Sequence, residues 1–67
     1  MASRQHKQAL APRELSAAML YAQGRSHKDI EATLGLTPAT VRTYLRMAYA
    51  ALGVSNNLEL VAALRHQ

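Results

Sequence analysis

Apolar residues recur along this chain at intervals of three and four positions, which is the period of a helix packed on one side. No segment alternates apolar and polar residues as a half-buried strand would, so no sheet is expected. The predicted helices lie between Pro12 and Gly24, between Ser26 and Gly35, between Thr37 and Gly53, and from Asn56 to about Arg65. The pattern therefore predicts an all-α fold of four helices.

Capping residues mark the starts of these helices. Ser26 and Asp29 have the spacing of a capping box, in which the hydroxyl accepts the third amide proton and the carboxylate accepts that of the cap. Asn56 begins the same pattern in the last helix. Thr37 precedes Pro38, and proline fits the first helical position because the N–H that it lacks would have no partner there.

The two middle helices are joined by the short turn Gly35-Leu36-Thr37. A turn of this kind sets two helices at a steep angle and is typical of a helix-turn-helix. At 100° per residue, one side of the third helix collects apolar residues that we expect in the core, namely Val41, Leu45, Ala48 and Leu52. The opposite side presents Ala39, Arg42, Thr43, Arg46 and Ala50.

This outward strip has the chemistry that reading the major groove of DNA requires. Arginines such as Arg42 and Arg46 can donate to guanine O6 and N7 together, and a threonine such as Thr43 can meet a thymine methyl group. The small alanines allow the helix to approach the base edges closely. The strip favours sequence-specific binding of double-stranded DNA, whereas two arginines on an arbitrary helix are usually ordinary surface cations.

One set of motifs spans nearly the whole chain, from about Leu10 to Leu64, without gaps. Its parts are Ala11–Glu14, Gln23–Ile30, Leu34–Thr43, Tyr49, Leu52–Asn56 and Glu59–Ala62. Together they resemble the LuxR/GerE-type DNA-binding domain. The resemblance implies a bundle-like, four-helix helix-turn-helix domain and a transcription regulator of bacterial or phage origin. It also implies an inverted-repeat site, bound by a homodimer that pairs through the last helix.

The resemblance also implies roles for individual residues. Base contacts are expected from Arg42, Thr43 and Arg46, the residues that the helical wheel places outward. Phosphate contacts are expected from Arg25, Ser26, His27, Lys28 and Thr40. The dimer interface is expected at Leu58, Val61, Ala62 and Arg65. Two departures from the family pattern stand out: Ala11 replaces the usual threonine cap, and no sensor or receiver domain accompanies the motif. A stand-alone autoregulator, acting as a repressor, is therefore expected.

Composition limits the remaining possibilities. The 67 residues allow one domain, with residues 1–9 as a loose N-terminal arm and 10–67 as the helix-turn-helix domain. With no cysteine, neither disulfides nor thiolate metal sites are available, and no metal, cofactor or small-molecule ligand is expected. Eight Lys and Arg against four acids give a net charge of +4, which favours nucleic acid as a partner. No signal peptide or membrane span is evident, so a cytoplasmic location is expected.

Two other classes of function compete with DNA binding. An enzyme is not expected, because Ser26, His27 and Asp29 lie on one helical turn, where neighbouring residues point apart and cannot relay a proton. The serious alternative is an interaction module that heterodimerises with a larger LuxR-type regulator and inhibits it, using the last helix. An RNA-binding or sigma-like role also stays open.

Overall fold

The computed structural model describes residues 10–65, and within this range the chain forms four helices and no strand. They are α2 (Pro12–Ala22), α3 (His27–Leu34), α4 (Pro38–Leu52) and α5 (Asn57–Arg65). The all-α prediction and the helix boundaries read from the caps are confirmed. The predicted arm, residues 1–9, lies outside the described residues.

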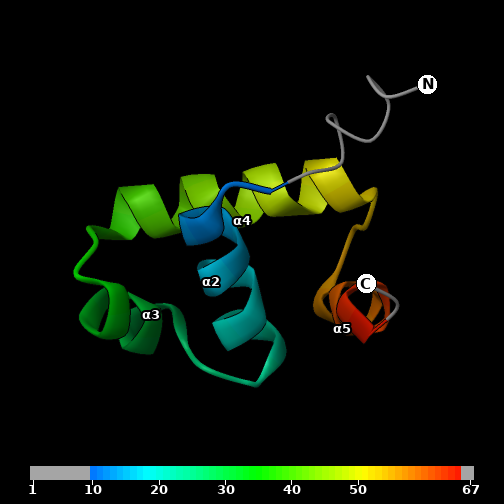
Figure 1. Cartoon of the computed structure of the whole chain (residues 1–67). Helices are drawn as coiled ribbons and strands as arrows, with labels where there is room; N and C mark the ends of the chain where they lie inside the picture. Colours follow the sequence, from blue (N-terminus) through cyan, green and yellow to red (C-terminus); the bar gives the residue numbers. More distant parts are fainter. Residues whose placement is uncertain (1–9, 66–67) are drawn as a thin grey trace.

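Helix α2 is the centre of the fold and packs against each of the other three helices. In Figure 1, α3 and α5 lie on either side of α2, and α4 runs across all three. The nearly continuous apolar sequence of α2 predicts this position, because a helix that is apolar on most sides must be covered by others. Met19 is the exception, since its side chain is 47% exposed.

The core consists of two small clusters that meet at α2. The cluster towards α3 contains Ala17, Ile30, Val41 and Leu45, and the cluster towards α5 contains Ala18, Ala48 and Leu60. Each places a small alanine of α2 against a larger side chain of a neighbouring helix, so the helices approach closely. The predicted core face of α4 is confirmed at three positions, while Leu52 at its end is half-buried and packs against the second cluster.

A glycine followed by an apolar residue ends both α3 and α4. Gly35 and Gly53 each have φ of 68°, a left-handed conformation that suits glycine because it has no Cβ. The N–H of the residue after the glycine donates back to a carbonyl of the helix. At the end of α3, the Leu36 N–H donates to the Glu31 carbonyl at 3.0 Å. The Leu36 side chain then packs on the first cluster. This closure fixes the turn from which α4 departs.

The predicted caps are formed at α3 and α4. At α3, the Ser26 hydroxyl accepts from the Asp29 N–H at 3.1 Å, and the Asp29 carboxylate accepts from the Ser26 N–H at 3.3 Å. At α4, the Thr37 hydroxyl oxygen accepts from the Thr40 N–H at 3.3 Å. The helices on both sides of the turn therefore begin at defined residues.

The other two helices are capped less regularly. Ala11 has no side-chain group that can cap α2, so only half of a capping box forms there: the Ala11 N–H donates to the Glu14 carboxylate at 3.3 Å. At α5, Asn56 accepts from the Glu59 N–H at 2.9 Å, as the sequence predicts. The Glu59 carboxylate, however, accepts from the Ser55 N–H at 2.7 Å rather than from the cap residue itself.

Candidate nucleic-acid interface

The predicted strip on α4 is exposed along its whole length. Arg42, Thr43 and Arg46 are all open to solvent, and so are the flanking alanines Ala39 and Ala50. The opposite face of α4 is held in the core, so the helix cannot rotate to hide the strip. The small flanking residues leave the two guanidinium groups and the threonine as the most prominent polar groups of this face.

Met47 is an exposed residue of α4 that sequence reasoning did not single out. Its side chain is 46% exposed, and it follows Thr43 by one helical turn. The helical wheel contains the signal, because position 47 falls beside position 43 at the edge of the strip. An apolar side chain at this place is suited to contact with a thymine methyl group.

The residues expected to contact phosphate gather around the start of α3. Arg25, Ser26, His27 and Lys28 are all exposed there. The Ser26 hydroxyl accepts the Asp29 amide proton, which leaves its own proton available for a further acceptor. The first turn of a helix also presents unpaired amides and the positive end of the helix dipole. These groups together can hold an anion.

Thr40 lies apart from this group, in the first turn of α4, and is half-buried. Its hydroxyl accepts a hydrogen bond from the Thr37 hydroxyl at 3.0 Å. Because Thr37 supplies that proton, the Thr40 hydroxyl retains its own for donation. The cap of α4 thus orients a second hydroxyl donor beside the strip.

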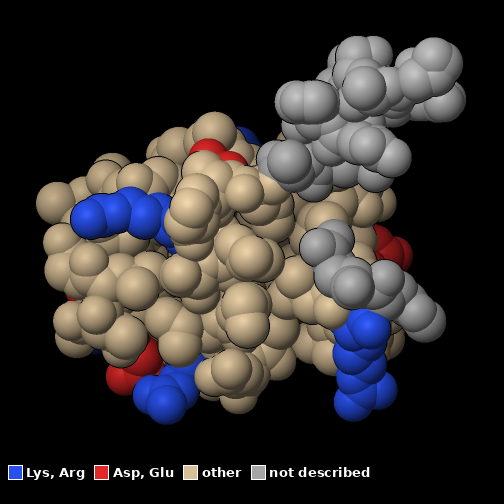
Figure 2. Space-filling view, viewed as in Figure 1, with Lys and Arg blue, Asp and Glu red and all other residues tan. Residues whose placement is uncertain are grey.

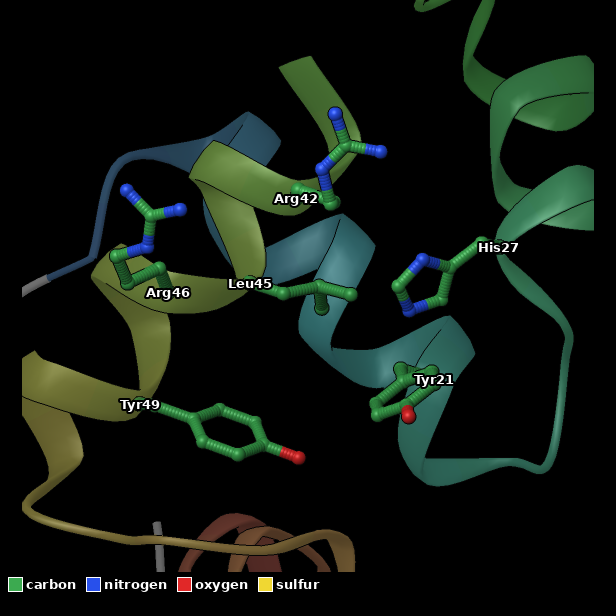
Figure 3. Close-up of a pocket in the computed structure, with 6 residues that line it drawn as sticks. All are labelled: Tyr21, His27, Arg42, Leu45, Arg46 and Tyr49. Atoms are coloured by element: carbon green, nitrogen blue, oxygen red, sulfur yellow. The ribbon is translucent and has the colours of Figure 1, made fainter. Parts of the chain in front are cut away.

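A shallow hollow of about 350 Å³ separates the start of α3 from the arginines of α4. Figure 3 shows its lining: Tyr21 from α2, His27 from α3, and Arg42, Leu45, Arg46 and Tyr49 from α4. The rings of Tyr21 and His27 meet edge to face, with centroids 5.3 Å apart and planes at 65°. The fold thus brings one predicted phosphate residue, His27, to the same hollow as two predicted base-reading residues.

Tyr21 and Tyr49 both line this hollow, and neither was predicted from the sequence to contribute to the interface. Burial and the neighbouring Tyr21 phenol raise the pKa of the Tyr49 hydroxyl above its ordinary value of 10.0. The phenol is therefore neutral near pH 7 and can donate a hydrogen bond. On the wheel, position 49 lies next to position 42, but its approach to α2 and α3 depends on the tertiary fold.

Three of the four acidic residues of the chain lie in the first turns of helices. Glu14, Asp29 and Glu59 each lie in a first turn, and each accepts from a backbone N–H there. The exposed strip of α4 itself contains no acidic residue that could pair with Arg42 or Arg46. On the face shown in Figure 2, charged side chains are scattered among broad uncharged areas. The strip and the start of α3 each carry exposed cations, Arg42 and Arg46 on the strip and Arg25 and Lys28 at the start of α3.

Helix α5 exposes the stripe predicted as a dimer interface. Leu58 is 80% exposed, and Ala62 and Arg65 are exposed on the same side, at spacings of four and three residues. Val61, also expected at the dimer interface, is less exposed than these residues and lies half-buried at the edge of the stripe. Another side of α5 faces the core, where Leu60 is fully buried and Leu64 packs against the second cluster.

The part of the chain that the structure describes holds neither a cluster of metal ligands nor a membrane-spanning helix. Within 10–65, no three His, Asp or Glu side chains gather as metal ligands would. None of the four described helices combines the length and the apolar character needed to cross a membrane.

Comparison with known proteins agrees with this geometry. The model of the family described as bacterial regulatory proteins, luxR family, matches residues 8–64. A Mycobacterium tuberculosis protein described as an HTH-type transcriptional regulator is 40% identical over 52 residues, or 78% of this chain. The transcriptional regulatory protein UhpA of Escherichia coli is 45% identical over 51 residues, or 76% of the chain.

The matched segment is a small part of each relative, 6% of the mycobacterial protein and 26% of UhpA. No solved structure matches the chain. The family match nevertheless covers all four helices except the last residue of α5, and it includes the α3–α4 turn and the exposed strip. The chain therefore belongs to the luxR family of bacterial regulatory proteins, non-enzymatic transcription regulators that bind DNA through this helix-turn-helix domain.

Proposed function

We propose that this chain recognises a specific inverted repeat in double-stranded DNA as a homodimer and represses transcription by occupying that site. Helix α4 enters the major groove, and Arg42, Thr43 and Arg46 contact base edges. The observation that carries the proposal is the exposed strip of α4, which is rigidly opposed to a buried face on the same helix. Selection from a random duplex library tests it, and the expected product is an inverted repeat with half-sites about one turn, ~34 Å, apart.

The start of α3 and the cap of α4 are proposed to hold the DNA backbone. Ser26, Lys28 and Thr40 are the principal groups, with Arg25 and His27 beside them. Ser26 and Thr40 retain hydroxyl protons, and Lys28 is an exposed cation. Contacts of this kind fix the register of a protein on the duplex but do not distinguish bases.

Lys28→Ala is expected to weaken binding to all sequences alike, because one phosphate contact and its released counterion are lost. The slope of log affinity against log salt should become shallower by about 0.9. Fluorescence anisotropy at several salt concentrations measures this slope, and Lys28→Arg, which retains the charge, should leave it near the parent value. An unchanged slope for Lys28→Ala would mean that Lys28 makes no phosphate contact.

The homodimer is proposed to pair through the α5 stripe of Leu58, Val61, Ala62 and Arg65. Leu58 is 80% exposed, so burying its side chain against a partner would remove apolar surface from water and stabilise the dimer. A two-fold axis would bury the stripe of one chain against the same stripe of the other. One short helix from each chain makes a small interface. We therefore expect the dimer to have a dissociation constant in the micromolar range or above in the absence of DNA. Binding to the inverted repeat should then drive its assembly.

Leu58→Asp is expected to prevent pairing and to lower affinity for the inverted repeat at least tenfold, since a buried carboxylate would lie at the dimer axis. Sedimentation and footprinting measure the two effects. The helical circular dichroism should persist, because the monomer does not bury Leu58. Asn57→Asp adds the same charge at a neighbouring exposed position outside the stripe and should behave as the parent does.

Two results would change this proposal. If Leu58→Asp still protects both half-sites at parent concentrations, the dimer is not built on α5. If the parent chain binds no duplex by itself but pairs with a larger luxR-type regulator through α5, the inhibitory interaction module is the better account.

A further inference from the structure

The hollow between α3 and α4 combines two kinds of surface that suit one chemical group. Its floor is mainly apolar, formed by Leu45 and the rings of Tyr21 and Tyr49. Its rim is formed by Arg42 and Arg46, whose guanidinium groups extend outward from α4, and by the imidazole of His27, and no acidic residue lines it. An anion joined to a small apolar ring would satisfy both surfaces, and a deoxyribose with its phosphate is such a group.

The position of the hollow agrees with that chemistry. It adjoins the arginines proposed to enter the major groove and the start of α3, proposed to hold the backbone. A backbone strand that borders the major groove must pass between these two regions when α4 is inserted. Resting on the function proposed above, we propose that the hollow seats one sugar-phosphate unit of the bound DNA and that protonated His27 pairs with its phosphate, so that binding takes up a proton.

The charged and titratable groups around His27 determine whether phosphate binding favours protonation of its imidazole. Tyr21 of α2 faces the imidazole, and α4 contributes Arg42, Arg46 and Tyr49. Its nearest charged neighbours in sequence are Arg25, Lys28 and Asp29. A seated phosphate favours a positive charge on the imidazole, because opposite charges at close range attract.

Histidine is the side chain that ordinarily changes charge between pH 8 and pH 5. Binding coupled to proton uptake therefore becomes tighter as the pH falls. When a bound group shifts a proton equilibrium by about one pH unit, affinity changes by at most about tenfold. We expect the parent chain to bind its selected duplex about three to ten times more tightly at pH 6 than at pH 8.

Fluorescence anisotropy at constant ionic strength tests this inference with three variants. His27→Gln should lose the pH dependence, and His27→Arg, which carries a constant charge, should bind tightly at both pH values. The double variant H6Q/H66Q removes the other two histidines of the sequence and should retain the parent dependence. Circular dichroism should show the same helix content for all, since His27 is exposed.

A second arm distinguishes DNA from a free anion. The His27 ring signals are followed by NMR while either the duplex or inorganic phosphate is added. A change at micromolar duplex, with inorganic phosphate effective only at tens of millimolar, supports a backbone site. Saturation by inorganic phosphate below a millimolar concentration, with displacement of the duplex, would identify a small-anion site and overturn the inference.

The failure of this inference can be told apart from failure of the proposed function. If His27→Gln shows the same pH dependence as the parent while both bind the duplex, His27 is not the coupled group and only the inference fails. If neither the parent nor H6Q/H66Q binds the selected duplex at any pH, DNA recognition itself is refuted.

Discussion

Replacing Arg42 and Arg46 together with alanine is expected to lower affinity for the selected duplex at least about thirtyfold. Each arginine paired with a guanine contributes about 1–3 kcal/mol of discrimination, and 1.4 kcal/mol corresponds to a factor of ten. Both side chains are exposed and neither belongs to the core, so stability should stay near that of the parent. Competition between selected and random duplexes, at one salt concentration, measures the loss of preference.

Arg13→Ala is the matched control for this pair. It also removes one exposed arginine, but from the first turn of α2, outside the proposed interface. It should retain the preference for the selected duplex. If the double variant at positions 42 and 46 distinguishes selected from random DNA as well as Arg13→Ala does, these arginines do not read bases.

Leu60→Ala is expected to bring the chain close to unfolding. Leu60 is fully buried and joins α5 to the alanines of α2 and α4, so its truncation leaves a cavity in a core that has little reserve. Leucine-to-alanine changes at such sites cost about 2–5 kcal/mol, and a domain of this size seldom has more than about 3–5 kcal/mol in total. Thermal unfolding should show a decrease in Tm of more than about 10 °C.

Leu58→Ala provides the same chemical change on the same helix, at a position that is 80% exposed. At concentrations where the chain is monomeric, it should alter stability by less than about 0.5 kcal/mol. Equal Tm values for the two variants would show that α5 does not pack on the core through Leu60.

The fold could be predicted because its signals are local. The caps at Ser26 and Thr37 and the glycines at 35 and 53 define helix ends by hydrogen bonds within a few residues. The two faces of α4 follow from helical periodicity alone. The exposed strip of the candidate site could therefore be predicted from the sequence.

Features that depend on how helices meet could not be predicted. The contact between Tyr21 and His27 joins two helices whose relative angle no periodicity specifies. The hollow that they share with Tyr49 arises only after α4 has packed on both. The partial burial of Val61 likewise depends on the tilt of α5 against its neighbours, since the wheel assigns a direction but not a distance.

The most direct test of the central claim is an NMR titration of the isotope-labelled chain with the selected duplex. We predict the largest changes along α4 at Ala39, Arg42, Thr43 and Arg46, with intermolecular contacts from the Thr43 methyl group to base protons. Smaller changes should follow at the start of α3. Changes centred on α5 or on α2, with the α4 strip unaffected, would contradict insertion of α4 into the major groove.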